Sequence, residues 1–563
     1  MHRLSQFFKQ TSAREHSCIP RRFISEAPLK SKKFDPKLPP FQSSTISRSI
    51  DYINGQKVEV QKIDGTPRNK QERPVGYDLK VPLPGFEEKP EEKKRVGEKW
   101  PTVITRLNNG MRVVTQNIPS PSCAVSLFVD AGAQYETDAN HGVTHLLERM
   151  SFQSTKNMES KRLVEELENL GGNITTTTQR DMVNYSCESL PENVPRMIEL
   201  LSDITVRPAF ADDEIEEQKE GIKMESEDMK RNKDIQPYIS DIIHSVAYNN
   251  QPLGRALSTE PELVDQLNSQ VVREYHSKLY VPPRFVLAVA GYDHDQVVEL
   301  SQRHFNVPYA PSVVSNVTSK WTGGIWIRRQ DDLIEEMEED QMDEAVDGSR
   351  RIQDIMSNLV LAFETKGTAA EETFPLAVLL SLFGGGGSFS AGGPGKGMYS
   401  RLYRNVLNGY GFVDSVQSFT SGFAETGMLG IHATCRMRDN NLDHLQQTIV
   451  HEMLDVVKRI DSEEFTRAQN QAKSGILMAL ESRNIVADDM GRQILIYNKR
   501  YSAEEIVNSI DRLTVTDVQD TLARIMSSRP AMVLAGSEAE LKQCAMLNDV
   551  EHHIKQHIRP TVL

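Results

Sequence analysis

The sequence lacks several features that mark common protein classes. Its 563 residues include only five cysteines and no CxxC pair, so neither a disulfide framework nor a thiolate zinc site is expected. No run of about 18 apolar residues occurs, so no membrane-spanning helix is expected. Basic residues are outnumbered, with 65 Lys and Arg against 79 Asp and Glu. The negative net charge argues against nucleic-acid binding and favours basic partners. A chain of this length should form more than one domain.

Acidic residues are nearly missing from residues 1–23, which carry five basic residues and the single acid Glu15. A basic, Ser-containing, amphipathic start predicts a mitochondrial transit peptide, and Arg21-Arg22-Phe23-Ile24 resembles a matrix cleavage site. The alternative is an ordinary disordered terminus. The predicted location is therefore the mitochondrial matrix, or the matrix face of the inner membrane. Residues 24–99 are rich in Pro, Lys and Glu and are expected to be an extended region. Their sequence indicates no particular function.

Glycine, in contrast, is concentrated in one place. Eight of the 33 glycines fall between Gly384 and Gly397, after an apolar run at 374–383 and before an amphipathic run at 398–407. Each glycine inside a helix or strand costs about 0.5–1 kcal/mol, so we expect a mobile loop between two helices. A flexible linker would join domains rather than interrupt an apolar region. A GxxxxGK[ST] phosphate loop needs Ser or Thr where Gly397 stands. The third interpretation is a backbone-lined clamp for a peptide, which needs support from the rest of the chain.

Turn signals and alternation of apolar residues predict an α+β region that begins near Trp100. Strands are expected at 102–115, as a hairpin, and at 123–131, 174–178, 182–190 and 285–291, with helices at 141–153 and 161–170. The predicted organisation is a first domain at 100–310, a linker at 311–350 and a second domain at 351–563. Ten acids occupy the seventeen linker positions from Asp331 to Asp347. This insert is expected to be solvated and disordered; the alternative is an electrostatic attractor for basic peptides.

The second half repeats features of the first half in the same order. GIKME at 221–225 matches GILMA at 475–479, and VLAVAG at 286–291 parallels AMVLAG at 531–536. A strand followed by Gly132 and a helix is paralleled by a strand followed by Gly367 and a helix. The roughly constant offset between the two halves predicts two homologous α+β domains of about 200 residues each.

The helix predicted at 141–153 contains His145, Glu148 and Arg149 at positions i, i+3 and i+4 of one face. An inverted zinc-protease motif, H-x-x-E-H, would place a second histidine where Arg149 stands. A guanidinium offers no lone pair and keeps its positive charge, so it repels Zn²⁺. We therefore expect an ion pair of Arg149 with Glu148 or a nearby acid, and no zinc. Glu225, on a predicted acidic helix at 212–228, is the candidate for a third ligand position.

With these motifs the chain resembles the pitrilysin-like (M16) metallopeptidases over about residues 100–563. The most specific stretches are 384–403 and 142–155. The resemblance implies two homologous M16-type domains of the α+β class, each a mainly antiparallel sheet packed with helices, joined by the acidic linker. Carried over from active members, His145 takes the first ligand position, Glu148 the general base, Arg149 the second ligand, Glu225 the distal ligand, and Gln218 the acid seven residues earlier. Arg149 and Gln218 depart from the pattern, which puts independent catalysis in doubt.

The resemblance further implies a noncatalytic subunit that forms a heterodimer with a zinc-bearing β subunit and binds presequence peptides of imported mitochondrial precursors. No catalytic residue, metal or other cofactor is expected in this chain, which is not expected to be active alone. The alternatives are a core structural subunit of the cytochrome bc1 complex at the inner membrane, both roles in one protein, or a self-sufficient zinc peptidase. The expected peptide-binding residues are Gly384, Gly385, Gly386, Gly387, Ser388, Phe389, Gly392, Gly393, Gly395, Lys396 and Gly397.

Overall fold

The computed structural model describes residues 100–231, 235–249, 251–311, 317–330, 356–368, 371–388, 397–438 and 440–558. It also gives two short paired strands, β1 (Tyr52–Ile53) and β2 (Gln56–Lys57), which belong to a unit at 14–97 that is separate from the larger unit. The predicted transit peptide, the acidic insert and most of 24–99 lie outside the described residues. None of the helices in the described ranges has the length and apolar character that crossing a bilayer requires.

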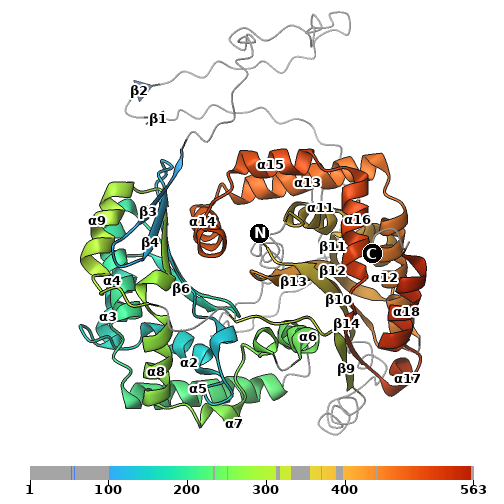
Figure 1. Ribbon diagram of the computed structural model, residues 1–563, viewed down its shortest axis with the longest axis horizontal. Helices are drawn as coiled ribbons and strands as arrows, with labels where there is room; N and C mark the ends of the chain where they lie inside the picture. The colour runs from blue at the N-terminus through green and yellow to red at the C-terminus, as the bar shows by residue number, and fades with distance from the viewer. Residues whose placement is uncertain are drawn as a thin grey trace, which may run out of the picture. The chain divides into compact units, whose positions relative to one another are not determined.

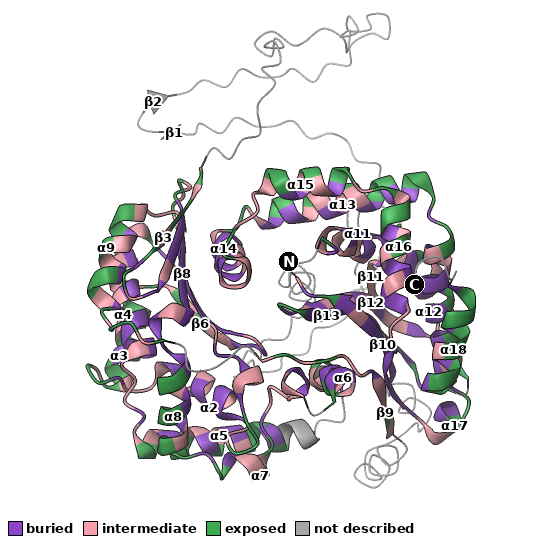
Figure 2. Cartoon of the chain, viewed as in Figure 1, coloured by how far each residue is buried: buried purple, intermediate pink, exposed green. Residues whose placement is uncertain are grey.

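Two six-stranded sheets organise the larger unit, in which most strand residues are buried (Figures 1 and 2). The first sheet has the order β3-β4-β8-β5-β7-β6, and the second has the order β11-β12-β13-β10-β14-β9. The strands are β3 (Thr102–Arg106), β4 (Arg112–Gln116), β5 (Cys123–Val129), β6 (Asn173–Thr178), β7 (Val183–Ser189), β8 (Phe285–Ala290), β9 (Gly324–Arg329), β10 (Met356–Lys366), β11 (Gly385–Gly387), β12 (Val413–Gly422), β13 (Thr426–Arg436) and β14 (Ala531–Gly536). All neighbouring pairs are antiparallel except β4 with β8 and β9 with β14. The α+β class and the mainly antiparallel sheets are confirmed.

Helices flank both sheets. In the first half they are η1 (Ala133–Tyr135), α2 (Val143–Arg149), η2 (Met150–Phe152), α3 (Ser160–Asn169), η3 (Pro191–Asn193), α4 (Val194–Val206), α5 (Asp212–Arg231), η4 (Gln236–Tyr238), α6 (Ile239–Tyr248), η5 (Pro252–Gly254), α7 (Pro261–Val264), α8 (Ser269–Leu279), η6 (Pro282–Arg284) and α9 (His294–His304). In the second half they are α11 (Thr373–Phe383), η8 (Leu402–Leu407), α12 (Asn441–Lys458), α13 (Ser462–Ala479), α14 (Arg483–Tyr497), α15 (Ala503–Asp511), α16 (Val515–Met526), α17 (Glu538–Leu541) and α18 (Leu547–His557).

The predicted internal repeat is confirmed by strand pairing. β4, β8, β5, β7 and β6 of the first sheet correspond in order and direction to β9, β14, β10, β13 and β12 of the second. The two repeated glycines have the same role. The amide of Gly132 donates to the carbonyl of Asp181 and that of Gly367 to the carbonyl of Glu425, and a Cβ at either glycine would overlap the backbone of the facing hairpin. The repeat therefore preserves a close backbone approach, which only glycine permits.

Two expectations from the sequence are wrong. Residues 324–329 fall in the predicted linker, but they form β9, which pairs with β14 from the far end of the chain. The glycine segment is predicted to lack strand structure, but Gly385–Gly387 forms β11 at the edge of the second sheet. The reason is the close approach of β12: a Cβ at Gly385, whose φ is +138°, would overlap the carbonyl of Val416. At Gly385 glycine is therefore required despite its entropic cost, because a side chain would overlap β12.

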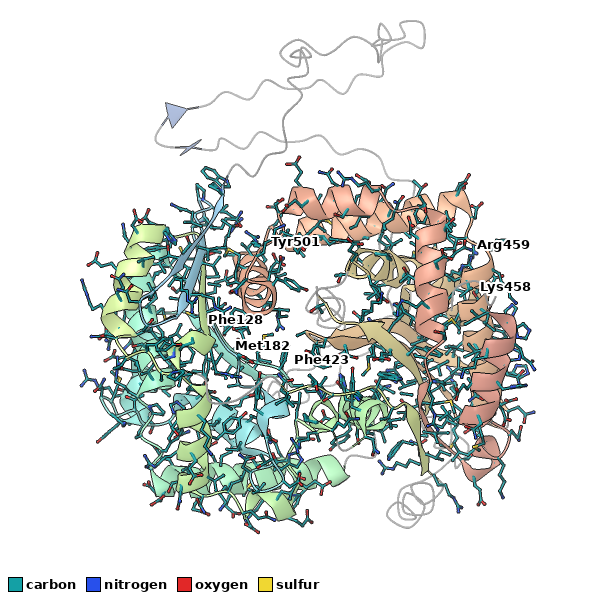
Figure 3. The ribbon with its side chains drawn as sticks, viewed as in Figure 1. Phe128, Met182, Phe423, Lys458, Arg459 and Tyr501 are labelled. Atoms are coloured by element: carbon teal, nitrogen blue, oxygen red, sulfur yellow. The ribbon has the colours of Figure 1, made fainter. Side chains whose placement is uncertain are left out.

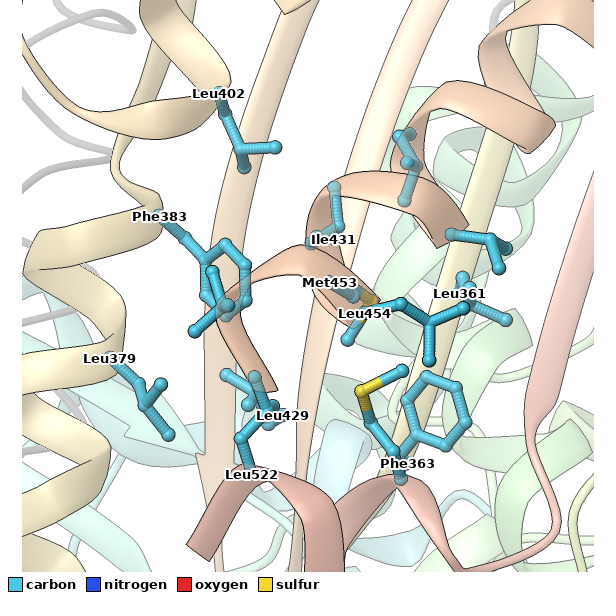
Figure 4. Packing of buried hydrophobic residues seen from close by; sticks show 14 of the residues in the cluster. Leu361, Phe363, Leu379, Phe383, Leu402, Leu429, Ile431, Met453, Leu454 and Leu522 are labelled. Carbon is cyan, nitrogen blue, oxygen red and sulfur yellow. The ribbon is translucent and has the colours of Figure 1, made fainter. Parts of the chain in front are cut away.

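The core of the second half lies between its sheet and the helices α11, α12 and α16 (Figure 4). Leu361, Phe363 and Ile431 project from β10 and β13 toward Phe383 of α11 and Met453 of α12, and all five are buried. The first sheet forms a corresponding buried core with the helices α2, α4, α8 and α9. Burial of these apolar faces is the main term that stabilises both halves.

The opposite face of each sheet is covered by a helix from the other half. α14 packs on β5 and β8 of the first sheet, where Met490 shares a buried cluster with Phe128 and Met182. Figure 3 labels Phe128 and Met182 near α14. In return, α6 packs on β14 and β9 of the second sheet, where Ile243 and Tyr248 meet Phe423. Because each half contributes a helix to the other, neither sheet has a complete core without its partner half.

Candidate functional site

The helix with the predicted motif, α2, follows Gly142 as its N-cap, and the φ of this glycine, +90°, lies in the left-handed region. A Cβ at this position would overlap the side chain of Thr259. The buried carboxylate of Glu136 accepts hydrogen bonds from the amides of Gly142 (3.0 Å) and Thr144 (2.9 Å) at the start of the helix. A carboxylate is favourable at a helix N-terminus, where amides lack partners within the helix. These contacts orient α2 so that its motif faces α5.

Arg149 occupies the place predicted for the second ligand, and it contacts both candidate residues of α5. Its Nη1 lies 2.9 Å from Oε2 of Glu225, and its Nε donates to Oε1 of Gln218 at 3.3 Å. The guanidinium also lies against Gly221, where a Cβ would come within 2.7 Å of Nη2. The predicted ion pair is therefore formed with Glu225 and not with Glu148. It is not deeply buried, since the two side chains are 30% and 50% exposed.

His145 joins the same group from the preceding turn of α2. Its Nε2 lies 3.8 Å from Oε2 of Glu225. The amide of Thr259 donates to its Nδ1 at 3.3 Å, so the neutral ring carries its proton on Nε2, facing Glu225. Burial lowers the pKa of His145, and Glu225 and Glu148 act in the opposite direction. In this tautomer Nε2 carries a proton toward Glu225, which a metal ion would have to displace.

Glu148 points elsewhere. Its Oε2 accepts a hydrogen bond from the amide of Thr178, at the end of the edge strand β6, at 2.8 Å. The structure thus gathers His145 and Arg149 around Glu225, places Gln218 against Arg149, and directs Glu148 to the neighbouring sheet. Within the described residues no group of three or more His, Cys, Asp or Glu side chains is arranged to hold a metal ion.

Substituting Arg149→His together with Gln218→Glu is expected to create a zinc site. The change replaces the cation with an imidazole opposite His145 and Glu225, which already lie within reach of each other. After dialysis the doubly substituted chain should retain about one Zn²⁺, measured by elemental analysis. The matched control combines Arg149→Lys with the same Gln218→Glu substitution and should retain none. Zinc retained equally by the lysine variant would show that Arg149 does not exclude the metal.

The glycine segment, residues 384–397, has its two ends held together by contacts that we call its base. Gly384 adopts a φ of +60°, and a Cβ there would overlap the side chain of Ser400 on the far side of the segment. The carbonyl of Gly384 accepts hydrogen bonds from both the amide and the hydroxyl of Ser418, each at 3.0 Å. The two ends of the segment are thus held together against β12. Of the predicted peptide-binding residues, Gly384–Ser388 and Gly397 are described, whereas Phe389, Gly392, Gly393, Gly395 and Lys396 lie outside the described residues.

Arg401 anchors the far end of this base, and sequence analysis missed it. Its guanidinium forms two hydrogen bonds with the carboxylate of Glu464 (2.8 and 2.9 Å), one with Asp455 (2.5 Å) and one with the carbonyl of Arg459 (2.7 Å). The side chain is only 5% exposed. No sequence signal marks this cluster, because its carboxylates lie 54 and 63 residues further along the chain.

Comparisons with known proteins agree with this architecture. Residues 112–260 match the family Insulinase (Peptidase family M16), and residues 266–472 match the Peptidase M16 inactive domain. The mitochondrial-processing peptidase subunit alpha of Solanum tuberosum is 35% identical over 78% of this chain and 83% of its own length, and that of Homo sapiens is 30% identical over 82% and 87%. A chain of Complex III2 from Candida albicans, bound to Inz-5, superposes with a TM-score of 0.65 at 19% identity, covering 80% of this chain and 99% of that chain. At that identity the structural likeness shows the fold alone.

Proposed function

Because the chain belongs to the M16 peptidase family, we propose that it is the noncatalytic, substrate-recognition α subunit of a mitochondrial processing peptidase. In this role it binds basic presequences of imported precursors in the mitochondrial matrix, and the β subunit of the same heterodimer cleaves them. The protein would then contribute no group to peptide hydrolysis and would be inactive alone.

The observation that carries the proposal is the ion pair of Arg149 with Glu225. It fills the space where an active member would hold zinc, and the proton on Nε2 of His145 faces the same carboxylate. A bound zinc would polarise the peptide carbonyl and activate water, and under this proposal only the β subunit holds it. The glycine segment, in contrast, keeps a built base through Ser400, Ser418 and Arg401. The chain thus combines a glycine segment whose two ends are held in place with a degenerate motif that is unsuited to metal.

The proposed peptide-binding segment is Gly384–Gly397. Glycine leaves the backbone N–H and C=O groups accessible, and these can bind a peptide whatever its side chains. Presequences are basic and varied, so a permissive backbone surface on a chain of net charge −14 suits them.

The proposal is tested by deleting Gly384–Gly387 and reconstituting the heterodimer with its β subunit. We expect weaker binding of a fluorescent presequence peptide and slower cleavage, while gel filtration and thermal unfolding show an intact heterodimer. Unchanged affinity and turnover in an intact heterodimer would contradict a role for the segment in recognition.

A second role as a core subunit of the cytochrome bc1 complex is supported only by the shared fold with a chain of Complex III2. Purification of the native assembly distinguishes the two roles. Recovery with the β subunit alone supports the peptidase, and recovery with cytochromes b and c1 supports membership of the bc1 complex.

A further inference from the structure

The edge of the second sheet ends in a strand made only of glycine. β11 pairs with β12 on one side, with Gly385 opposite Gln417 and Gly387 opposite Ser415, and no described strand pairs with its other side. The carbonyl of Gly384 and the amide of Ser388 bond to β12. Because the bonding direction alternates along a strand, Gly385 and Gly387 direct their N–H and C=O groups away from β12. Such an edge is a template for another extended chain.

The two faces of this strand differ. A Cβ at Gly386 would come within 3.1 Å of the ring of Tyr403, which covers one face from η8. Among the described residues, a Cβ at Gly387 would meet no atom within 4 Å. An incoming chain could therefore approach Gly387 without displacing a described side chain.

A carboxylate stands at the end of the same edge. Val413 pairs with Cys435 and Ser415 with Thr434, so Asp414 is the extra residue of a β-bulge. Bulges re-aim a side chain out of the regular alternation of a strand. The carbonyl of Asp414 accepts the amide of Ser388 at 2.6 Å, and its Oδ1 accepts the Ser388 hydroxyl at 2.8 Å. No ion pair among the described residues involves Asp414, whose carboxylate is bonded to the Ser388 hydroxyl.

We propose that the outer edge of β11 binds an extended basic peptide as an added strand, and that Asp414 selects an arginine or lysine of that peptide. This inference rests on the proposed role in presequence recognition and names the mode and the selecting residue. Backbone pairing with Gly385 and Gly387 is independent of sequence, and the carboxylate at the bulge supplies charge complementarity. The arrangement would recognise peptides that share only extended conformation and one positioned cation.

The test uses the heterodimer with a cleavage-inactive β subunit and a labelled peptide of residues 1–23 of this chain, which carries five basic residues. Substitution Asp414→Asn is expected to weaken binding about fivefold, as for a partly exposed ion pair. Replacing each basic residue of the peptide by glutamine in turn should identify one variant that no longer responds to Asp414→Asn. The matched control is Asp520→Asn, an exposed acid on α16, which should leave affinity unchanged.

A second measurement examines the strand itself. Hydrogen exchange at Gly385–Gly387 should slow when the peptide binds, because the outward amide groups gain partners. Any of three results would overturn the inference. They are unchanged exchange at these glycines, an Asp414→Asn loss of affinity that is the same for all five peptide variants, and an affinity loss in Asp520→Asn as large as that in Asp414→Asn. If deletion of Gly384–Gly387 still abolishes binding while Asp414→Asn has no effect, the proposed function survives and only this inference fails.

Discussion

Replacing Arg401 with methionine is expected to destabilise the second half by about 3–5 kcal/mol, because breaking a buried ion pair leaves its partners uncompensated. The guanidinium is nearly inaccessible and satisfies both oxygens of Glu464 as well as Asp455. Methionine fills much of the volume but offers no donor. The carboxylate of Glu464, which is itself only 10% exposed, would then lack its counterion. Thermal unfolding of the purified heterodimer measures the loss.

The same substitution should weaken presequence binding at temperatures where the protein is still folded, because Arg401 follows Ser400, which closes the base of the glycine segment. Arg404→Met is the matched control, since Arg404 is exposed and, within the part of the chain that the structure describes, its side chain bonds only to the neighbouring Asn405. Arg401→Lys keeps the charge but not the paired hydrogen bonds, so it should restore part of the stability. Equal stability of the Arg401→Met and Arg404→Met variants would contradict the anchoring role.

Replacing Gly491 with alanine is expected to destabilise the protein by about 1–3 kcal/mol, the usual cost of adding volume to a packed core. Gly491 lies on the buried face of α14, and a Cβ there would overlap the ring of Phe128 in β5. The glycine therefore sets how closely α14 approaches the first sheet. Urea or thermal unfolding of the Gly491→Ala variant measures the cost.

A double-substitution cycle separates crowding from a general effect of glycine in a helix. In a Phe128→Ala background the ring is gone, so Gly491→Ala should no longer destabilise and should gain up to about 1 kcal/mol from helix propensity. The sign of the effect is thus expected to reverse between the two backgrounds. The same loss of stability in both would show that contact with Phe128 is not the cause.

Residue chemistry and local spacing determined part of this protein by themselves. The repeat followed from matched segments such as 286–291 and 531–536, since buried strands of equal role keep similar apolar sequences. The unsuitability of Arg149 as a ligand followed from its missing lone pair. Gly132 and Gly367 marked corresponding turns because close backbone approach admits no side chain.

Tertiary structure alone decided which distant groups meet. Strand β9 was missed because six residues of an apparent linker become a strand only when β14, about 200 residues later, offers them a pairing edge. β11 was missed because the propensity of glycine argues against a strand and only the contact with Val416 requires one. The choice of Glu225 over Glu148 as the partner of Arg149, and the cluster around Arg401, depend on how helices pack. Residue types and short-range spacing are present in the sequence itself, whereas the contacts between distant segments exist only once the chain has folded.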